Sequence, residues 1–158
     1  MAVIVSAVIV TNKRMTENDK VKAASFIYEN LEFEFEQLED GTYEITGFRS
    51  WEESVTIPLY IPYGDGKIQF SSIGESAFAN NTTITEIILP ESITHIGKGA
   101  FSHCTNLTRV VMSDSVVSID EYAFNKCEQL KDITFSGNLK TIGAYAFSDC
   151  NSLVQITL

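Results

Sequence analysis

The chain has 158 residues, of which 44% are hydrophobic, and its 21 acidic and 11 basic side chains give a formal net charge of −10. This length and apolar content predict about one domain with a buried core, and they exclude a wholly disordered chain. The acidic balance argues against a nucleic-acid partner, whose phosphates need clustered Lys and Arg, and against adhesion to anionic membranes.

The chain opens with an apolar run, AVIVSAVIV at residues 2–10. These nine residues are too few to span a bilayer, which takes about 20. No Lys or Arg precedes the run and no small-residue cleavage site follows it, so a β-strand is favoured over a trimmed export signal. No later run approaches membrane length, and we expect no membrane insertion.

The next segment, residues 16–29, is predicted to be a helix with Thr16 as its N-cap. Residues 31–45 predict a β-hairpin, because apolar and polar side chains alternate on either side of an Asp40-Gly41 turn. The residues expected to face inward from this hairpin are Leu31, Phe33, Phe35, Tyr43 and Ile45.

From residue 71 onward, one pattern recurs every 23 residues. Such repetition predicts a solenoid, in which each coil buries its apolar face against the next. The three cysteines follow the same period; their odd number and long spacing argue against a disulfide framework and against a metal site, so we expect free, buried thiols. The recurring positions are Ala77-Phe78, Ala100-Phe101, Ala123-Phe124 and Ala146-Phe147, with Cys104, Cys127 and Cys150.

Each unit begins L-x-x-I-x-L, as at residues 107–112, and this alternation predicts a short strand. An I-G turn follows, where Gly74, Gly97 and Gly143 are expected to need a positive φ and Asp120 is a tolerated substitute. The segment x-x-A-F-x-x-C is too short for a free helix and is expected to form one or two helical turns.

This unit, with L-x-x-I-x-L leading to I-x-x-I-G-x-x-A-F-x-x-C, resembles the BspA-like (treponemal-type) leucine-rich repeat. The resemblance covers residues 71–158 closely and extends weakly to a hairpin at 33–48 and a degenerate strand at 55–58. It implies an α/β solenoid, a right-handed stack of parallel strands with short helical turns on the opposite side. Members are usually cell-surface or secreted proteins that act in adhesion and protein binding, which implies a protein partner.

We expect the chain to divide at residue 70. Residues 1–70 would cap the stack with a strand, a helix, a hairpin and a degenerate first coil that carries an insertion at 60–66. Residues 71–158 would be the repeats. The alternative for the N-terminal part is a separate binding domain.

Little in the sequence points to catalysis. Both histidines, His95 and His103, are expected to face solvent on the turn side, and the adjacent Cys104 should point inward, away from His103, and stay protonated. Motifs for phosphate loops, zinc proteases and serine hydrolases are missing from the sequence. We therefore expect no enzyme, no cofactor and no metal site.

Outward positions on neighbouring strands would form two columns, with about 4.8 Å between strands. Alternating charges and β-branched residues stabilise a sheet in any case. The columns are also a candidate protein-docking surface on the concave face, with a structural spacer that has no ligand of its own as the alternative function. The first column is Glu86, Arg109, Asp132 and Gln155, and the second is Ile88, Val111, Thr134 and Thr157.

The last coil is expected to expose apolar side chains, because no polar segment follows it in the sequence. An uncovered end invites another chain. This predicts that the chain is a piece of a longer array or that two copies associate end to end. The residues concerned are Phe147, Leu153, Ile156 and Leu158.

Overall fold

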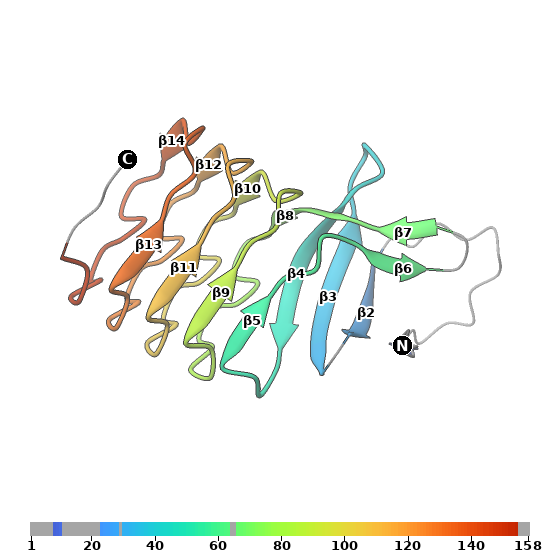
Figure 1. Cartoon of the computed structure of the whole chain (residues 1–158), viewed down its shortest axis with the longest axis horizontal. Coiled ribbons are helices and arrows are strands. Elements are labelled where there is room, and N and C mark those ends of the chain that lie inside the picture. The colour runs from blue at the N-terminus through green and yellow to red at the C-terminus, as the bar shows by residue number, and fades with distance from the viewer. Residues whose placement is uncertain (1–7, 11–22, 29, 64–65, 155–158) are drawn as a thin grey trace.

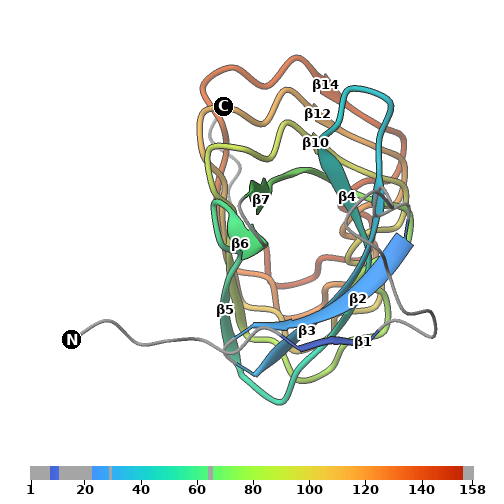
Figure 2. The same ribbon diagram turned by 90° about the vertical axis from the view of Figure 1, so that its right-hand side faces the viewer.

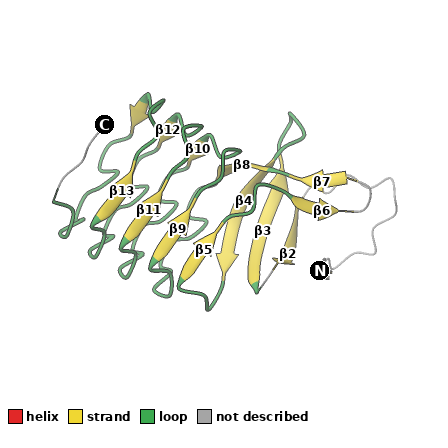
Figure 3. Cartoon of the chain, viewed as in Figure 1, coloured by secondary structure: helices red, strands yellow, loops and turns green. Residues whose placement is uncertain are grey.

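The computed structural model describes residues 8–10, 23–28, 30–63 and 66–154. Over these ranges the chain forms fourteen short strands and no helix, and the strands follow one another in a stack of coils (Figures 1 and 3). Accordingly, the described part of the chain holds no helix long and apolar enough to cross a bilayer.

The strands form three sheets. Viewed along the stack, successive coils surround a common interior, and the two larger sheets form different walls of it (Figure 2). The eight-stranded sheet contains, in order, β1 (Val8–Val10), β2 (Ala23–Tyr28), β3 (Leu31–Gln37), β4 (Tyr43–Arg49), β8 (Phe70–Ile73), β10 (His95–Ile96), β12 (Ser118–Ile119) and β14 (Thr141–Ile142). The four-stranded sheet contains, in order, β13 (Asp132–Thr134), β11 (Arg109–Val111), β9 (Glu86–Ile88) and β5 (Ser54–Thr56). The third sheet is the hairpin of β6 (Ile61–Tyr63) and β7 (Gly66–Ile68).

Strands β1 to β4, which we call the cap, extend the eight-stranded sheet and pair antiparallel with one another. β3 and β4 form the predicted hairpin, whose turn is fixed by Gly41 at φ 87° and by a 2.8 Å hydrogen bond from the Thr42 N–H to the Asp40 carboxylate. The apolar run at 2–10 is a strand where it is described, in β1, and its other residues lie outside the described ranges. The inward residues of the hairpin are buried as predicted: Leu31, Phe33, Phe35, Tyr43 and Ile45.

The helix predicted at 16–29 is wrong over residues 23–28. This segment is β2, which pairs antiparallel with β3 from Ala23↔Glu36 to Tyr28↔Leu31. β3 offers a row of backbone donors and acceptors at its edge, and pairing satisfies these groups on both strands, which outweighs a weak helix propensity. Residues 16–22 and 29 lie outside the described ranges.

The degenerate first coil is present. β5 pairs in parallel with β9, with Val55 beside Ile87, as the pattern at 55–58 predicts. The insertion at 60–66 is part of the β6–β7 hairpin, in which Ile61 pairs with Ile68 and both side chains are buried.

A stack of phenylalanine rings runs through the interior. Successive ring centroids lie 4.5, 4.8, 5.0 and 5.2 Å apart, and the angle between ring planes falls from 27° to 3° along the stack. Four rings come from the Ala-Phe pairs and confirm their predicted place in the core; the first comes from the cap. The rings, in order, are Phe48, Phe78, Phe101, Phe124 and Phe147.

The Ala-Phe segments are turns and not helices, so the predicted helical turns are wrong. The N–H groups of Ser76, Phe78 and Asn80 donate to carbonyls of the following coil at 2.8 to 3.0 Å, whereas a helix pairs its amides within itself. Two residues per coil have a left-handed φ of 57° to 61°, which turns the amides toward the neighbour. These positions are Ser76, Gly99, Tyr122 and Tyr145, and Asn80, His103, Lys126 and Asp149.

This set of hydrogen bonds between the turns, which we call the turn ladder, runs in one direction. The Phe101 N–H, for example, donates to the Ala123 carbonyl of the next coil, and the other coils repeat this sense. Backbone hydrogen bonds of the strand segments run in both directions. The Thr108 N–H donates to the Thr85 carbonyl of the preceding coil, whereas the Leu89 N–H donates to the Val111 carbonyl of the following coil. On the turn side, peptide groups are therefore aligned along the stack.

The glycine of the I-G turn is needed for space and not for a positive φ, which corrects our expectation. A Cβ added to Gly97 would lie 2.9 Å from the carbonyl carbon of Gly74 and 2.9 Å from the oxygen of Ile73 in the preceding coil. The left-handed φ falls two residues later, at Gly99. Close approach of neighbouring coils explains the repeated glycine.

Replacing the two glycines with alanine separates these roles. Gly97→Ala should lower the free energy of unfolding by about 1–3 kcal/mol, because the added methyl group forces two backbones apart. In Gly99→Ala the added Cβ meets no atom closer than 3.6 Å. The free energy of unfolding should fall by about 1 kcal/mol, because alanine is strained at a left-handed φ. Urea unfolding measures both, and a larger loss for Gly99→Ala would contradict the assignment.

The ring stack predicts a large effect of a single truncation. Phe101→Ala should cost about 3–5 kcal/mol of unfolding free energy, because the ring is fully buried between two others. The control is His103→Asn in the same coil, which is exposed and keeps a residue suited to φ 61°; it should cost under about 0.5 kcal/mol. Similar midpoints in thermal or urea unfolding would show that the stack is not the core.

Candidate functional site

The three cysteines are free and form a column along the stack. The Cys104 thiol donates to the Phe78 carbonyl of the preceding coil at 3.1 Å, and the Cys127 and Cys150 thiols donate in the same way to the carbonyls of Phe101 and Phe124. Burial raises the pKa of Cys104 to about 12, which leaves the thiol protonated at neutral pH. Across the described ranges, no three His, Cys, Asp or Glu side chains are grouped so as to hold a metal ion.

His103 and Cys104 diverge, as predicted for adjacent residues. The His103 ring is exposed and its Nδ1 lies 3.0 Å from the Ser102 hydroxyl, whereas Cys104 is fully buried. The thiol therefore has no histidine to deprotonate it, and the pair lacks the geometry of a cysteine nucleophile.

His95 lies in β10 and not on the turn side, which corrects its predicted position. Its Nδ1 is 2.7 Å from the Ser118 hydroxyl and its Nε2 is 3.3 Å from the Asp120 carboxylate. Parallel register places Ser118 directly beside His95. This cluster was not predicted from the sequence, although the 23-residue spacing between His95 and Ser118 is its signal.

Serine, histidine and carboxylate groups in contact also occur in hydrolases, where backbone N–H groups stabilise the oxyanion. Here the N–H groups of Gly97 and Asp120 donate to the carbonyls of Ile73 and Ile96 at 2.7 and 2.9 Å. Neither is available to an oxyanion. The cluster therefore fits a polar contact between neighbouring coils and not a nucleophilic site.

The structure places the two predicted columns side by side on the four-stranded sheet. Parallel register sets Arg109 between Glu86 and Asp132, and it aligns the second column in the same way. β5 adds one residue to each column, Ser54 beside Glu86 and Thr56 beside Ile88, and neither was predicted from the sequence. Gln155 and Thr157 lie outside the described residues. This surface is a candidate for protein docking, and we call it the docking face. It consists of Ser54, Glu86, Arg109 and Asp132, and of Thr56, Ile88, Val111 and Thr134.

An ion-pair network fixes the charged column. Arg109 Nη1 lies 2.7 Å from Glu86 Oε1, and its Nε lies 3.1 Å from Asp132 Oδ2. The Ser54 hydroxyl donates to Glu86, and this hydrogen bond, together with Arg109, lowers the pKa of Glu86. Exposed ion pairs add little to stability, so the main effect of the network is to hold these side chains in one arrangement.

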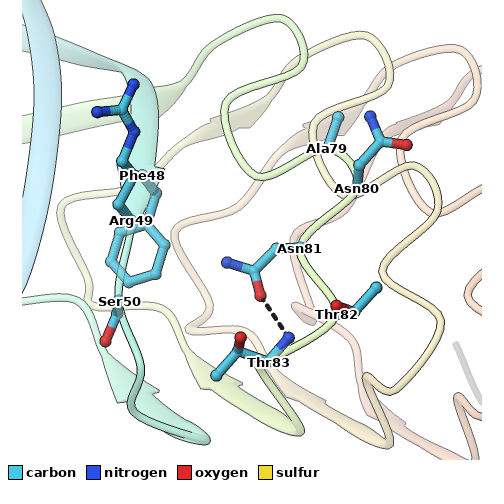
Figure 4. Close-up of a pocket in the computed structure, with 8 residues that line it drawn as sticks. All are labelled: Phe48, Arg49, Ser50, Ala79, Asn80, Asn81, Thr82 and Thr83. Carbon is cyan, nitrogen blue, oxygen red and sulfur yellow. Dashed lines mark hydrogen bonds between the residues drawn. The ribbon is translucent and has the colours of Figure 1, made fainter.

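A polar cleft of about 310 Å³ lies where the cap meets the first coil (Figure 4). One wall is Phe48, Arg49 and Ser50 at the end of β4, and the other is the loop at residues 79–83. No pattern in the sequence predicted this cleft.

The last described coil is less covered than those before it. Ile142 is 42% exposed, whereas its equivalent Ile119 is 1% exposed. Phe147 and Leu153 are partly exposed, as predicted. The other two residues predicted at this end, Ile156 and Leu158, lie outside the described ranges.

The 23-residue pattern matches a known protein family. The family described as BspA type leucine rich repeat region matches residues 66–158 in six copies, which is more than half of the chain. The chain belongs to this family. The resemblance inferred from the repeat unit is thereby confirmed, and the coils are leucine-rich repeats.

Solved structures of bacterial leucine-rich repeat proteins are similar to this chain. A leucine rich cell surface protein from Faecalibacterium prausnitzii is 30% identical with a TM-score of 0.71, and the match covers 82% of this chain and 35% of that one. A leucine rich repeat protein from T. pallidum is 32% identical with a TM-score of 0.72, with coverages of 77% and 56%. One from Bacteroides ovatus is 35% identical with a TM-score of 0.70, with coverages of 78% and 33%.

The chain therefore spans about a third to just over half of the length of these relatives. No curated protein matches it.

The cysteine column predicts slow thiol chemistry in the folded protein. At pH 8, Cys104 should resist alkylation by iodoacetamide, because it is buried and its pKa is raised to about 12. In denaturant all three thiols should react, since none is in a disulfide. Mass spectrometry counts the alkylated residues, and a single reactive thiol in denaturant would reveal a disulfide and contradict the column.

Proposed function

We propose that the chain is a non-catalytic protein-interaction module of a bacterial cell-surface or secreted protein, with a role in adhesion, and that it binds its partner through the docking face. The family and the description of the Faecalibacterium prausnitzii relative as a cell surface protein support this class of function. The single observation that carries the proposal is the pair of aligned columns on the four-stranded sheet.

Two properties of the docking face favour a protein partner. The Arg109 network holds charged groups in a fixed order, so little side-chain entropy is lost when a partner binds. Beside it, the partly exposed Ile88 and Val111 provide apolar contact area between the exposed Thr56 and Thr134. A polar and an apolar stripe in fixed register give a partner both orientation and contact area.

A structural spacer without a ligand of its own is the second candidate. It is favoured by the same network, because Arg109 is already paired within the chain and needs no partner to neutralise it. A module that binds through this face should lose affinity when its surface charges are reversed. A spacer has no partner whose binding could change.

Charge reversal on the docking face tests the proposal. Arg109→Glu combined with Asp132→Lys should weaken binding to a partner at least about 10-fold, because opposite charges across an interface become like charges. The matched control reverses an ion pair on the turn side, Lys98→Glu with Glu121→Lys, where the wild-type pair lies at 3.3 Å. The control should bind like the wild type.

The partner is first captured on wild-type protein from the native source, identified by mass spectrometry and purified. Its affinity for the three proteins is then measured by calorimetry, with thermal unfolding as a check on folding. Unchanged affinity after reversal on the docking face would contradict the proposed surface. Failure of the wild type to bind any purified candidate would favour the spacer.

A further inference from the structure

The cleft between β4 and the first coil arises from a difference in chain length. Register sets Ile45 beside Ile73 and Val55 beside Ile87. The segment from Ile45 to Val55 is therefore four residues shorter than the segment beside it, from Ile73 to Ile87, although both connect the same two sheets. Phe48 still reaches the ring stack, 4.5 Å from Phe78. The shorter segment has no residues that could pack beside the loop at 79–83. This loop therefore lines the cleft and, among the described residues, does not contact a neighbouring coil on that side.

One backbone acceptor in the cleft is left without its usual donor. In the next three coils, the equivalent carbonyls of Ser102, Asn125 and Ser148 each accept an N–H from the preceding coil at 2.8 Å. The equivalent residue of the first coil is Ala79, which lines the cleft, and no described residue donates to its carbonyl. The direction of the turn ladder aims this carbonyl toward the cap.

Further polar groups line the same space. Asn81 Oδ1 accepts the N–H groups of Thr83 and Ile84 at 2.9 and 3.0 Å, which fixes the side chain and leaves its amide nitrogen to point between the two walls (Figure 4). The side chains of Asn80 and Thr82 make no hydrogen bond to another described residue. The cleft therefore presents the fixed amide of Asn81 together with further amide, hydroxyl and carbonyl groups that are not paired within the described chain.

Charge and aromatic content narrow the ligand class. The one charged side chain in the lining, Arg49, is paired with Glu34 at 3.4 Å, and the net charge of −10 repels anions. Directly after Ser50 comes Trp51, which is 74% exposed. An uncharged set of hydrogen-bonding groups, with an exposed aromatic residue directly after one wall in the sequence, suits a ligand with polar edges and apolar faces.

We propose that this cleft binds a neutral saccharide. Sugar hydroxyls donate to the Ala79 carbonyl and accept from the amides of Asn80 and Asn81, while Trp51 packs against the C–H face of a ring. A peptide strand fits less well, because it would need alternating backbone donors and acceptors. The N–H groups of Ala79, Asn80, Asn81 and Thr83 are already paired within the chain. The site is distinct from the docking face and does not depend on the proposed function.

The single tryptophan of the chain gives a direct readout. Titration with maltotriose, cellotriose and chitotriose should produce a saturable change in Trp51 fluorescence for at least one of them, with a Kd of about 1 mM or tighter. Asn80→Gly should weaken this binding about 3- to 10-fold through the loss of one hydrogen bond, while glycine tolerates the φ of 61°. The matched control is Lys126→Gly, at φ 58° in an equivalent position two coils away, which should bind like the wild type.

Amide NMR spectra recorded during the same titrations locate the site, and signals of residues 79–83 should shift. The proposal is overturned if no trisaccharide gives saturable changes, if the shifted signals lie on β9 and β11, or if the two glycine variants weaken binding equally. Saturable binding of peptides in the cleft without any response to sugars would replace the saccharide with a peptide ligand. Loss of partner binding by the docking-face variant has no bearing on these titrations.

Discussion

Backbone pairing between successive coils decides which residue each position of the repeat accepts. The turns contain no helix, so the amide of Phe78 must find its carbonyl one coil away, at Ala100. That requirement brings the coils close enough to exclude a Cβ at Gly97, and it forces a left-handed φ on residues as large as Tyr122. The buried Phe and Cys columns then fill the space that this pairing defines.

The candidate sites differ in how they relate to this pairing. The docking face lies where pairing is complete, and its side chains inherit a fixed spacing from the strands beneath them. The cleft lies where pairing stops, because the short arc of the cap leaves the Ala79 carbonyl without a donor. The docking face thus depends on regular pairing between the coils, and the cleft depends on the place where this pairing is interrupted.

Features that depend on the 23-residue period could be predicted from the sequence. Features that depend on the backbone conformation of the turns could not. The 23-residue spacing was enough to predict the stacked rings, the free cysteines and the alignment of Arg109 with Asp132. It did not reveal the turns, because Tyr122 and Lys126 are not residue types that signal a left-handed φ. The error at residues 23–28 has another cause, since an available edge on β3 overrode local preference. The cleft follows from a four-residue difference in segment length, and this difference can be counted only once the register of β4 and β5 is known.

The direction of the turn ladder makes the stack polar in the sense that a filament is polar. Its N-terminal end carries the acceptors, the Ala79 carbonyl among them, while the last described turn presents the N–H groups of Tyr145 and Phe147. Two such turns meeting face to face would oppose donors with donors, so a symmetric tail-to-tail pair gains nothing from them. A unit that continues this ladder has to arrive with its carbonyls leading, which makes head-to-tail addition the only orientation that extends the pairing.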